Sequence, residues 1–354
     1  MRRTAVLSLL LALPLLLAGC RAGGRSEPEQ IYLVSAVGFD PDSNGGVRLS
    51  LEVPLTRESA DESPAPALFT GEGGTVEEAL RQIAAGLGRR LLFSHCALLV
   101  LGDGLSREQL EAIFGFAESG VTLPLAAQVI AAPDAGALLR GGSLSTPAAG
   151  YDVPGIFRQV SGSLGLDVRC RIYELRADAS PGRPVVLPLF RAAGEDAPEA
   201  AVFGGLRLLR EGKPALELSP EQSVWYAMLT GRYDGENGSP GGLLGARLRG
   251  VKSEIGAGRS GEDLWLSLAL RMEAAGWLPA GEADALCTRI EEGVRGLFLS
   301  LREQAGEDVF LLGDRLARQD AALWQELAPD FARLFAGAEL RVSCEIRAKE
   351  SGNR

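Results

Sequence analysis

Few residues of this chain of 354 could carry out chemistry, and the most conspicuous are a neighbouring histidine and cysteine. His95 is the only histidine, and it precedes Cys96 in the apolar stretch LLFSHCALLVL at 91–101. A nearly continuous apolar run is typical of a strand buried on both faces. Neighbouring strand residues point to opposite faces, so the pair could not share a metal ion or form a catalytic couple. We predict a buried structural His95, hydrogen-bonded near the strand centre, although either residue could still meet a distant carboxylate.

The remaining cysteines also lack the spacing of a reactive centre. They contain no C-x-x-C pair and none of the spacings of a zinc site. Export would permit one or two disulfides among them, but unpaired cysteines are among the most buried residue types. We therefore predict buried thiols and no metal site at Cys96, Cys170, Cys287 and Cys344.

One glycine pattern imitates a dinucleotide-binding motif. Gly256, Gly258 and Gly261 have the required spacing, but such a motif must open a helix. Here the alternating stretch EDLWLSLALRM follows, which predicts a strand, so we interpret the glycines as a link between two strands. The sequence also contains no G-x-S-x-G, P-loop or H-E-x-x-H motif. We predict a protein that is not an enzyme and uses no cofactor.

Composition and charge narrow the class of protein. The chain is 46% hydrophobic and 23% charged, which indicates a folded body rather than a disordered chain. Its net charge is −10, which becomes −12 if Arg2 and Arg3 are removed. Nucleic acid is an unsuitable partner for such an acidic protein.

The first residues, MRRTAVLSLLLALPLLLAGC, predict export. The apolar stretch at 5–18 is shorter than the roughly 20 residues of a membrane-spanning helix, and Pro14 interrupts it. The ending LAGC resembles a bacterial lipobox, in which the cysteine receives a diacylglycerol and becomes the new amino terminus. Two acyl chains are enough for stable anchoring. We predict a signal peptide at 1–19, lipidation of Cys20 and a lipidated tether at 20–30.

The rest of the chain predicts a mixed α/β fold. Its first half alternates strands and helices, which favours partly parallel pairing. The predicted elements are strands at 31–40 and 47–55 forming a half-buried hairpin, an exposed loop at 57–74, a helix capped by Thr75 and Glu78, the strand at 91–101, a helix capped by Ser106 and Gln109, and a strand at 123–131.

The second half is predicted to form a separate region after a linker at 194–200. A helix and a strand within 167–194 precede the linker. After it we expect a hairpin around 211–214, a helix capped at Ser219, strands at 243–254 and 263–277, a long helix at 282–304, a short helix holding Trp324 and a final strand at 338–348. The chain thus divides into an N-terminal α/β region at 31–193 and a C-terminal one at 200–349.

Several segments, in their order along the chain, resemble the Ger(x)C family of spore germination lipoproteins, the C subunits of bacterial spore nutrient-germinant receptors. The chain departs from the family in its polar loop at 57–70 and in arginine where many relatives have lysine. The matching segments are the lipobox, SAVGFD, LLFSHCALLVLGDGL, AVFGGLRLLREGKPALELSPEQSVWYAMLTGR and DVFLLGDRLARQDAALWQEL.

This resemblance implies a three-domain α/β fold and a receptor component that is not catalytic. It places the protein on the outer face of the spore inner membrane, anchored through Cys20 and working with the integral membrane A and B subunits. Germinant recognition is then expected mainly on those subunits, with no ligand site in this body. The alternative is a lipid-anchored solute-binding protein of a transporter, but that class has two similar lobes and the halves of this chain differ. A lipid-anchored hydrolase ranks third, because no nucleophile motif is present.

Overall fold

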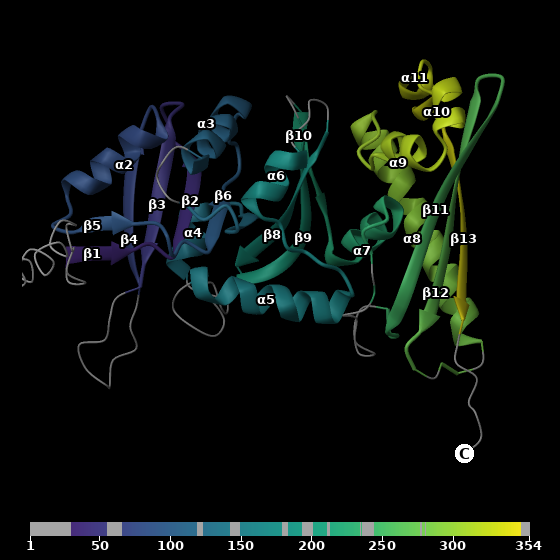
Figure 1. The fold of residues 1–354 in the computed structure, drawn as a ribbon, viewed down its shortest axis with the longest axis horizontal. Helices are drawn as coiled ribbons and strands as arrows, with labels where there is room; N and C mark the ends of the chain where they lie inside the picture. The colour runs from purple at the N-terminus through teal and green to yellow at the C-terminus, as the bar shows by residue number, and fades with distance from the viewer. Residues whose placement is uncertain are drawn as a thin grey trace, which may run out of the picture.

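The computed structural model describes residues 30–54, 66–118, 123–141, 149–178, 183–192, 201–210, 213–233, 235, 244–276, 278–279 and 281–347. The predicted signal peptide, Cys20 and almost all of the tether lie outside these ranges. Three sheets follow one another along the long axis of the molecule (Figure 1).

The largest sheet has eight strands in the order β10-β9-β8-β7-β6-β2-β3-β4. Strands β2, β6, β7 and β8 pair in parallel, and the outer strands pair antiparallel. A separate two-stranded parallel sheet joins β1 (Ile31–Leu33) to β5 (Arg90–Leu92). The strands of the large sheet are β2 (Ala36–Pro41), β3 (Val47–Val53), β4 (Ala67–Gly73), β6 (Leu98–Leu101), β7 (Gln128–Ala131), β8 (Val185–Ala192), β9 (Ala201–Arg210) and β10 (Lys213–Leu218).

Helices cover both faces of this sheet. On one face, α2 (Val76–Ala85) and α3 (Arg107–Glu118) bury Ile83 and Phe116 against Phe39 of β2. On the other face, α4 (Ala135–Gly141) and α5 (Ala149–Leu164) pack in a second core cluster. A short helix, α6 (Ile172–Asp178), leads toward β8. The alternating strands and helices therefore produce parallel pairing in the centre of the sheet, as predicted.

The carboxyl-terminal part is built on a three-stranded sheet of β11 (Leu248–Ser260), β12 (Asp263–Ala274) and β13 (Glu339–Arg347). The long helix α8 (Glu282–Ala305) packs on this sheet, with Ile290, Val294 and Phe298 among its buried residues. Three short helices connect α8 to β13: α9 (Leu312–Gln319), α10 (Ala321–Leu327) and α11 (Phe331–Phe335).

Helix α7 (Pro220–Thr230) joins the two parts of the molecule (Figure 1). It packs against β9 on one side and α8 on the other, and its residues from Ser223 to Leu229 are all buried. At the contact with α8, a Cβ atom added to Gly293 would lie 2.5 Å from the ring of Trp225. Only glycine allows the indole ring to approach the helix backbone this closely, so α7 and α8 share a tightly packed interface.

Two predictions about the first sheet are wrong. The hairpin of β2 and β3 is not half-buried, because Ser50 and Glu52 on its polar face are buried as well. Helix α4 packs against that face, and the Ser35 hydroxyl donates to the Glu52 carboxylate at 2.6 Å. The predicted loop at 57–74 contains a strand, β4, which pairs with β3; residues 57–65 lie outside the described ranges.

The predicted linker at 194–200 lies outside the described residues, and the strands before and after it, β8 and β9, pair antiparallel within the large sheet. The predicted N-terminal and C-terminal regions therefore both contribute strands to one sheet, and their division near residue 193 stays a prediction. Within the described ranges, every helix falls short of the length and apolar character that a bilayer span requires.

Candidate functional site

His95 does not occupy the predicted position. The stretch 91–101 is broken by a turn between β5 and β6, and His95 lies exposed in that turn. The Cys96 amide donates to the Phe93 carbonyl at 2.8 Å across the turn, and it is Phe93 and Cys96 that are buried. The prediction of a buried, hydrogen-bonded histidine in a strand is wrong, because the turn exposes the imidazole and buries Phe93 and Cys96 instead.

The cysteines are reduced thiols in the described structure, and two of the four are fully buried as predicted. The Cys96 thiol donates to the Leu98 carbonyl at 3.4 Å, and burial raises its pKa to about 12. Cys170 is also buried, whereas Cys287 of α8 and Cys344 of β13 are half-buried and their thiols share a hydrogen bond. Burial and this contact raise the pKa of Cys344. In the described ranges, no three histidine, cysteine or acidic side chains are grouped so that they could hold a metal ion.

The glycine pattern serves packing. Gly256 and Gly258 lie within β11, and Gly261 forms the turn into β12 with φ of +63°. A Cβ atom on Gly258 would lie 2.1 Å from the ring of Trp265, its cross-strand partner. The prediction of a link between strands holds for Gly261 only, because Gly256 and Gly258 lie within β11, where added Cβ atoms would approach Ser267 and Trp265 of β12.

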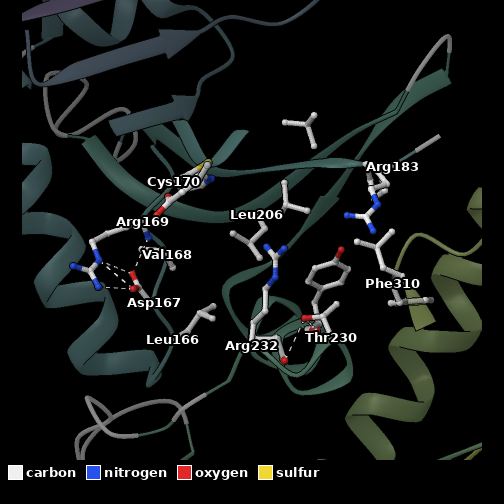
Figure 2. Close-up of a pocket in the computed structure, with 18 of the residues that line it drawn as sticks. Leu166, Asp167, Val168, Arg169, Cys170, Arg183, Leu206, Thr230, Arg232 and Phe310 are labelled. Carbon is white, nitrogen blue, oxygen red and sulfur yellow. Dashed lines mark hydrogen bonds and ion pairs between the residues drawn. The ribbon is translucent and has the colours of Figure 1, made fainter. Parts of the chain in front are cut away.

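A cavity of about 370 Å³ lies where the two parts of the molecule meet (Figure 2). Its walls come from the segment at 166–170, the start of β8, the last turn of α7 and the segment that opens α9. Apolar side chains such as Leu166, Leu206 and Phe310 form much of the wall. We call it the arginine cavity, after Arg169, Arg183, Arg232, Arg315 and Arg318 in its lining.

Arg315 is the most buried of these arginines, with 6% of its surface exposed. Its guanidinium donates to the Leu229 carbonyl at 2.5 Å and to the Ser253 carbonyl at 2.9 Å. Burial lowers the pKa of Arg315, with a further contribution from the positive charge of Arg318. Arg315 thus ties α9 to the end of α7 and to β11 through carbonyl oxygens.

Ion pairs hold several other charged groups of the arginine cavity. Arg169 binds Asp167 through Nε at 2.8 Å, which lowers the pKa of that carboxyl. Glu174 lies 3.5 Å from Arg171, and Arg183 pairs with Asp314 of α9. The hydroxyl of Tyr226, at the wall, donates to the Val309 carbonyl at 2.9 Å, and burial raises its pKa.

A second cavity, of about 320 Å³, lies at the carboxyl ends of β6 and β7. Open α/β sheets bind ligands in this position. Here an ion-pair network occupies the wall: the buried Arg207 of β9, 4% exposed, pairs with the more exposed Asp103 and Glu217. Burial favours the neutral form of Glu217, but the pairs with Arg207 and Arg191 outweigh it and lower the pKa.

Asp40, the last residue of SAVGFD, explains how two matching segments fit together. Its carboxylate accepts from the amides of Ala135 at 2.8 Å and Gly136 at 2.9 Å, which fixes α4 on the sheet. A Cβ atom on Gly102, in the segment after β6, would lie 1.9 Å from Asp40 Oδ1. A glycine is therefore needed beside this carboxylate, a contact that no motif in the sequence marks.

Comparison with known proteins gives consistent matches. The profile of the spore germination protein N-terminal domain matches residues 24–188. Spore germination protein KC of Bacillus subtilis (strain 168) is 30% identical over 118 residues, which cover 31% of this chain and 28% of that protein. The crystal structure of the GerBC protein shares the fold with a TM-score of 0.54 and 12% identity, covering 88% of this chain and 96% of that one. The domain match and the relative make this chain similar to spore germination proteins, and the GerBC structure shares its mixed α/β fold.

Proposed function

We propose that the protein is the lipid-anchored C subunit of a spore nutrient-germinant receptor and acts, without catalysis, with two integral membrane subunits. The observation that carries this proposal is the match of residues 24–188 to the spore germination protein N-terminal domain. The fold shared with GerBC supports it along most of the chain. The role in spore germination, the anchor and the partners are all part of this proposal.

The anchor is assigned to Cys20, which lies outside the described residues. The first strand begins at Ile31, so the tether at 20–30 spans roughly 35 Å at most when extended. This length keeps the folded body at the membrane surface. Confinement raises the effective concentration of the body for membrane partners, so that an interface of micromolar affinity in solution would be largely occupied.

A function through protein contacts, rather than through catalysis, is supported by the environments of Cys96 and Arg207. A nucleophilic cysteine needs a lowered pKa and access to solvent. Cys96 has the opposite properties, since it is buried and its pKa is raised to about 12. The buried Arg207 is held in an ion-pair network with Asp103 and Glu217.

The solute-binding alternative requires two similar lobes around a cleft. The large sheet has eight strands with mixed pairing, and the carboxyl-terminal sheet has three. Parts built so differently do not make a pair of related lobes, and this favours the receptor subunit over the transport protein.

The test is recovery of membrane partners from spores. The tagged full-length chain should be isolated from solubilised spore inner membranes, and its co-purifying proteins should include the two receptor membrane subunits. The matched control is Cys20→Ala, which should leave an uncleaved or mislocalised precursor and recover little of either partner. Acylation of the Cys20→Ala chain, seen by mass spectrometry, would contradict the anchor, and recovery of neither partner by the wild-type chain would contradict the proposed role.

A further inference from the structure

We propose that the two-stranded sheet of β1 and β5 lies with its outer face against an anionic phospholipid surface, where Arg89 and Arg90 contact lipid phosphates and Leu33 enters the headgroup layer. This contact goes beyond the lipid anchor but rests on it, because the proposed lipidation of Cys20 brings the sheet to a membrane. It fixes which side of the folded body faces the bilayer.

The small sheet has one face turned toward the core and one turned away from it. Tyr32 of β1 and Leu91 of β5 are cross-strand partners, and both pack against the core of the large sheet. Successive strand residues point to opposite faces, so the other two cross-strand pairs point away from the core. These pairs are Ile31 with Arg90 and Leu33 with Leu92.

This outer face is mostly apolar. Leu33 keeps 40% of its surface exposed, which places it among the few large hydrophobic side chains that are so exposed in the described ranges. Ile31 and Leu92 are half-buried, and neither is part of the two core clusters. Apolar side chains beside positive charges suit the boundary between headgroups and acyl chains, where burial and attraction to anionic lipids act together.

The charge around the small sheet is opposite to that of the whole chain. The chain has 46 acidic and 36 basic residues, whereas the segments 30–39 and 81–102, which contain β1 and β5, have three arginines and no acidic residue. The three are Arg81, Arg89 and Arg90; all are exposed, and none forms an ion pair with another described residue. Arg89 stacks over the Tyr32 ring at 5.0 Å, which leaves its N–H groups available to a phosphate.

The position of the tether favours a membrane as the occupant of this face. The tether ends at β1, whose first residue, Ile31, pairs with Arg90. Cys20 is then within roughly 35 Å of the face. Figure 1 shows β1 and β5 at one end of the molecule and the sheet of β11, β12 and β13 toward the other. The basic, apolar face is therefore at the end nearest to the lipid, and each arginine at an anionic surface strengthens binding about five-fold.

The test places a tryptophan on the outer face and measures its contact with lipid. The lipidated chain carrying Leu33→Trp is reconstituted into vesicles of phospholipids with brominated acyl chains, which quench tryptophan at short range. The four native tryptophans lie between residues 225 and 324, and the wild-type chain measures their contribution. The matched control is Leu299→Trp, because Leu299 is 39% exposed on α8, in the carboxyl-terminal part.

Quenching of Leu33→Trp should be at least two-fold stronger in phosphatidylglycerol vesicles than in phosphatidylcholine vesicles. It should fall in about 0.5 M salt, because salt screens the arginines while the acyl anchor keeps the chain on the vesicle. Leu299→Trp should show little quenching in either lipid. Equal quenching of the two tryptophans, or none at position 33 in anionic vesicles, would overturn the proposal.

Charge variants of Leu33→Trp test the arginines. Arg90 is exposed, so Arg90→Gln preserves the fold, and it should at least halve the extra quenching in phosphatidylglycerol. Arg90→Glu should abolish that extra quenching. The control is Arg341→Gln, the same change of charge at an exposed position of β13. A loss with Arg341→Gln as large as that with Arg90→Gln would show an effect of overall charge and reject the face.

A protein partner is the competing occupant of this face. It would leave Leu33→Trp unquenched in protein-free vesicles, while Arg90→Glu would lower the recovery of membrane proteins from spores, and that result would overturn the lipid contact. Because the vesicles contain no other protein, failure to recover the receptor subunits leaves the quenching test unaffected. Mass spectrometry of the same preparation reports acylation of Cys20, so loss of the anchor is distinguished from loss of the face.

Discussion

Replacing Asp40 by asparagine should loosen α4 from the sheet while leaving the rest of the fold in place. The Asp40 carboxylate is 4% exposed, and each of its oxygens accepts one backbone amide, Oδ1 from Ala135 and Oδ2 from Gly136. Asparagine has one acceptor oxygen and one amide group that donates. In the Asp40→Asn protein, one of the two backbone N–H groups therefore faces another donor.

The size of the effect follows from this count. A hydrogen bond to a charged group contributes about 1.5–3 kcal/mol, and a buried donor without an acceptor adds a further cost. The neutral side chain recovers part of the free energy that burying a carboxylate requires. The free energy that holds α4 on the sheet should therefore fall by about 2 kcal/mol. The helix amides exchange when α4 opens, so their hydrogen exchange should become roughly 30-fold faster.

Hydrogen–deuterium exchange of the peptide that covers 135–141 is the direct assay. The control is Asp134→Asn, because Asp134 Oδ1 accepts the Ala137 amide at 2.6 Å in the manner of a helix cap. Asparagine serves that role as well as aspartate, so exchange should change little in the control. Similar exchange in both variants, or none above wild type in Asp40→Asn, would refute the role given to the two oxygens of Asp40.

The same substitution should change the dependence of stability on pH. Burial raises the pKa of Asp40 above its model-peptide value of 3.8, although the Ala135 and Gly136 amides partly offset this. The folded protein then binds the Asp40 proton more tightly than the unfolded chain does. Its contribution to stability is full below pH 3.8, falls as the pH rises through the folded pKa and is constant above it. Urea unfolding from pH 3 to 7 should show this decline in wild type and a weaker one in Asp40→Asn.

Three further outcomes are expected. The Cys96 thiol, buried with a pKa of about 12, should resist iodoacetamide at pH 8 in the folded protein and react after denaturation; rapid labelling of native protein, seen by mass spectrometry, would contradict its burial. Diamide should join the contacting thiols of Cys287 and Cys344 in an intramolecular disulfide, detected as the loss of two hydrogens and abolished by Cys287→Ser. Exposed His95 should tolerate His95→Gln with a change in unfolding free energy within about 0.5 kcal/mol in urea titrations, and a loss above 1 kcal/mol would restore a structural role.

The sequence was most informative where the interactions are local. The helix caps predicted at Thr75, Ser106 and Ser219 are found at the starts of α2, α3 and α7, with each hydroxyl accepting the amide three residues later. The reciprocal side-chain bond to the capping residue's own amide forms at Ser106 and Ser219. At Thr75, the Glu78 carboxylate accepts the Gly74 amide instead, at 3.0 Å. These capping hydrogen bonds join residues only three or four positions apart, so the sequence alone predicts them.

Predictions failed where distant segments determine the environment. Residues 67–73 looked like a loop because of their glycines, yet a Cβ atom on Gly71 or Gly73 would lie 2.5 or 2.6 Å from the backbone of Ala79 in α2. These glycines allow a helix to approach a strand closely rather than make a turn. The arginine cavity was missed for a similar reason. Its arginines come from separate segments of the chain, and each one alone resembles an ordinary surface charge.

The segment after β6 shows how the matching sequences act together. Phe39 of β2 pairs with Leu101 of β6 in parallel register, so the next residues, Asp40 and Gly102, become neighbours at the carboxyl ends of their strands. Gly102 leaves room for the carboxylate that holds α4, and the following residue, Asp103, pairs with buried Arg207 of β9. One short turn thus links a helix on one face with a strand that lies beyond β7 and β8. The segments VLGDGL and SAVGFD must occur together because each supplies half of this junction, which joins the central parallel strands to the strands that lead into α7 and the arginine cavity.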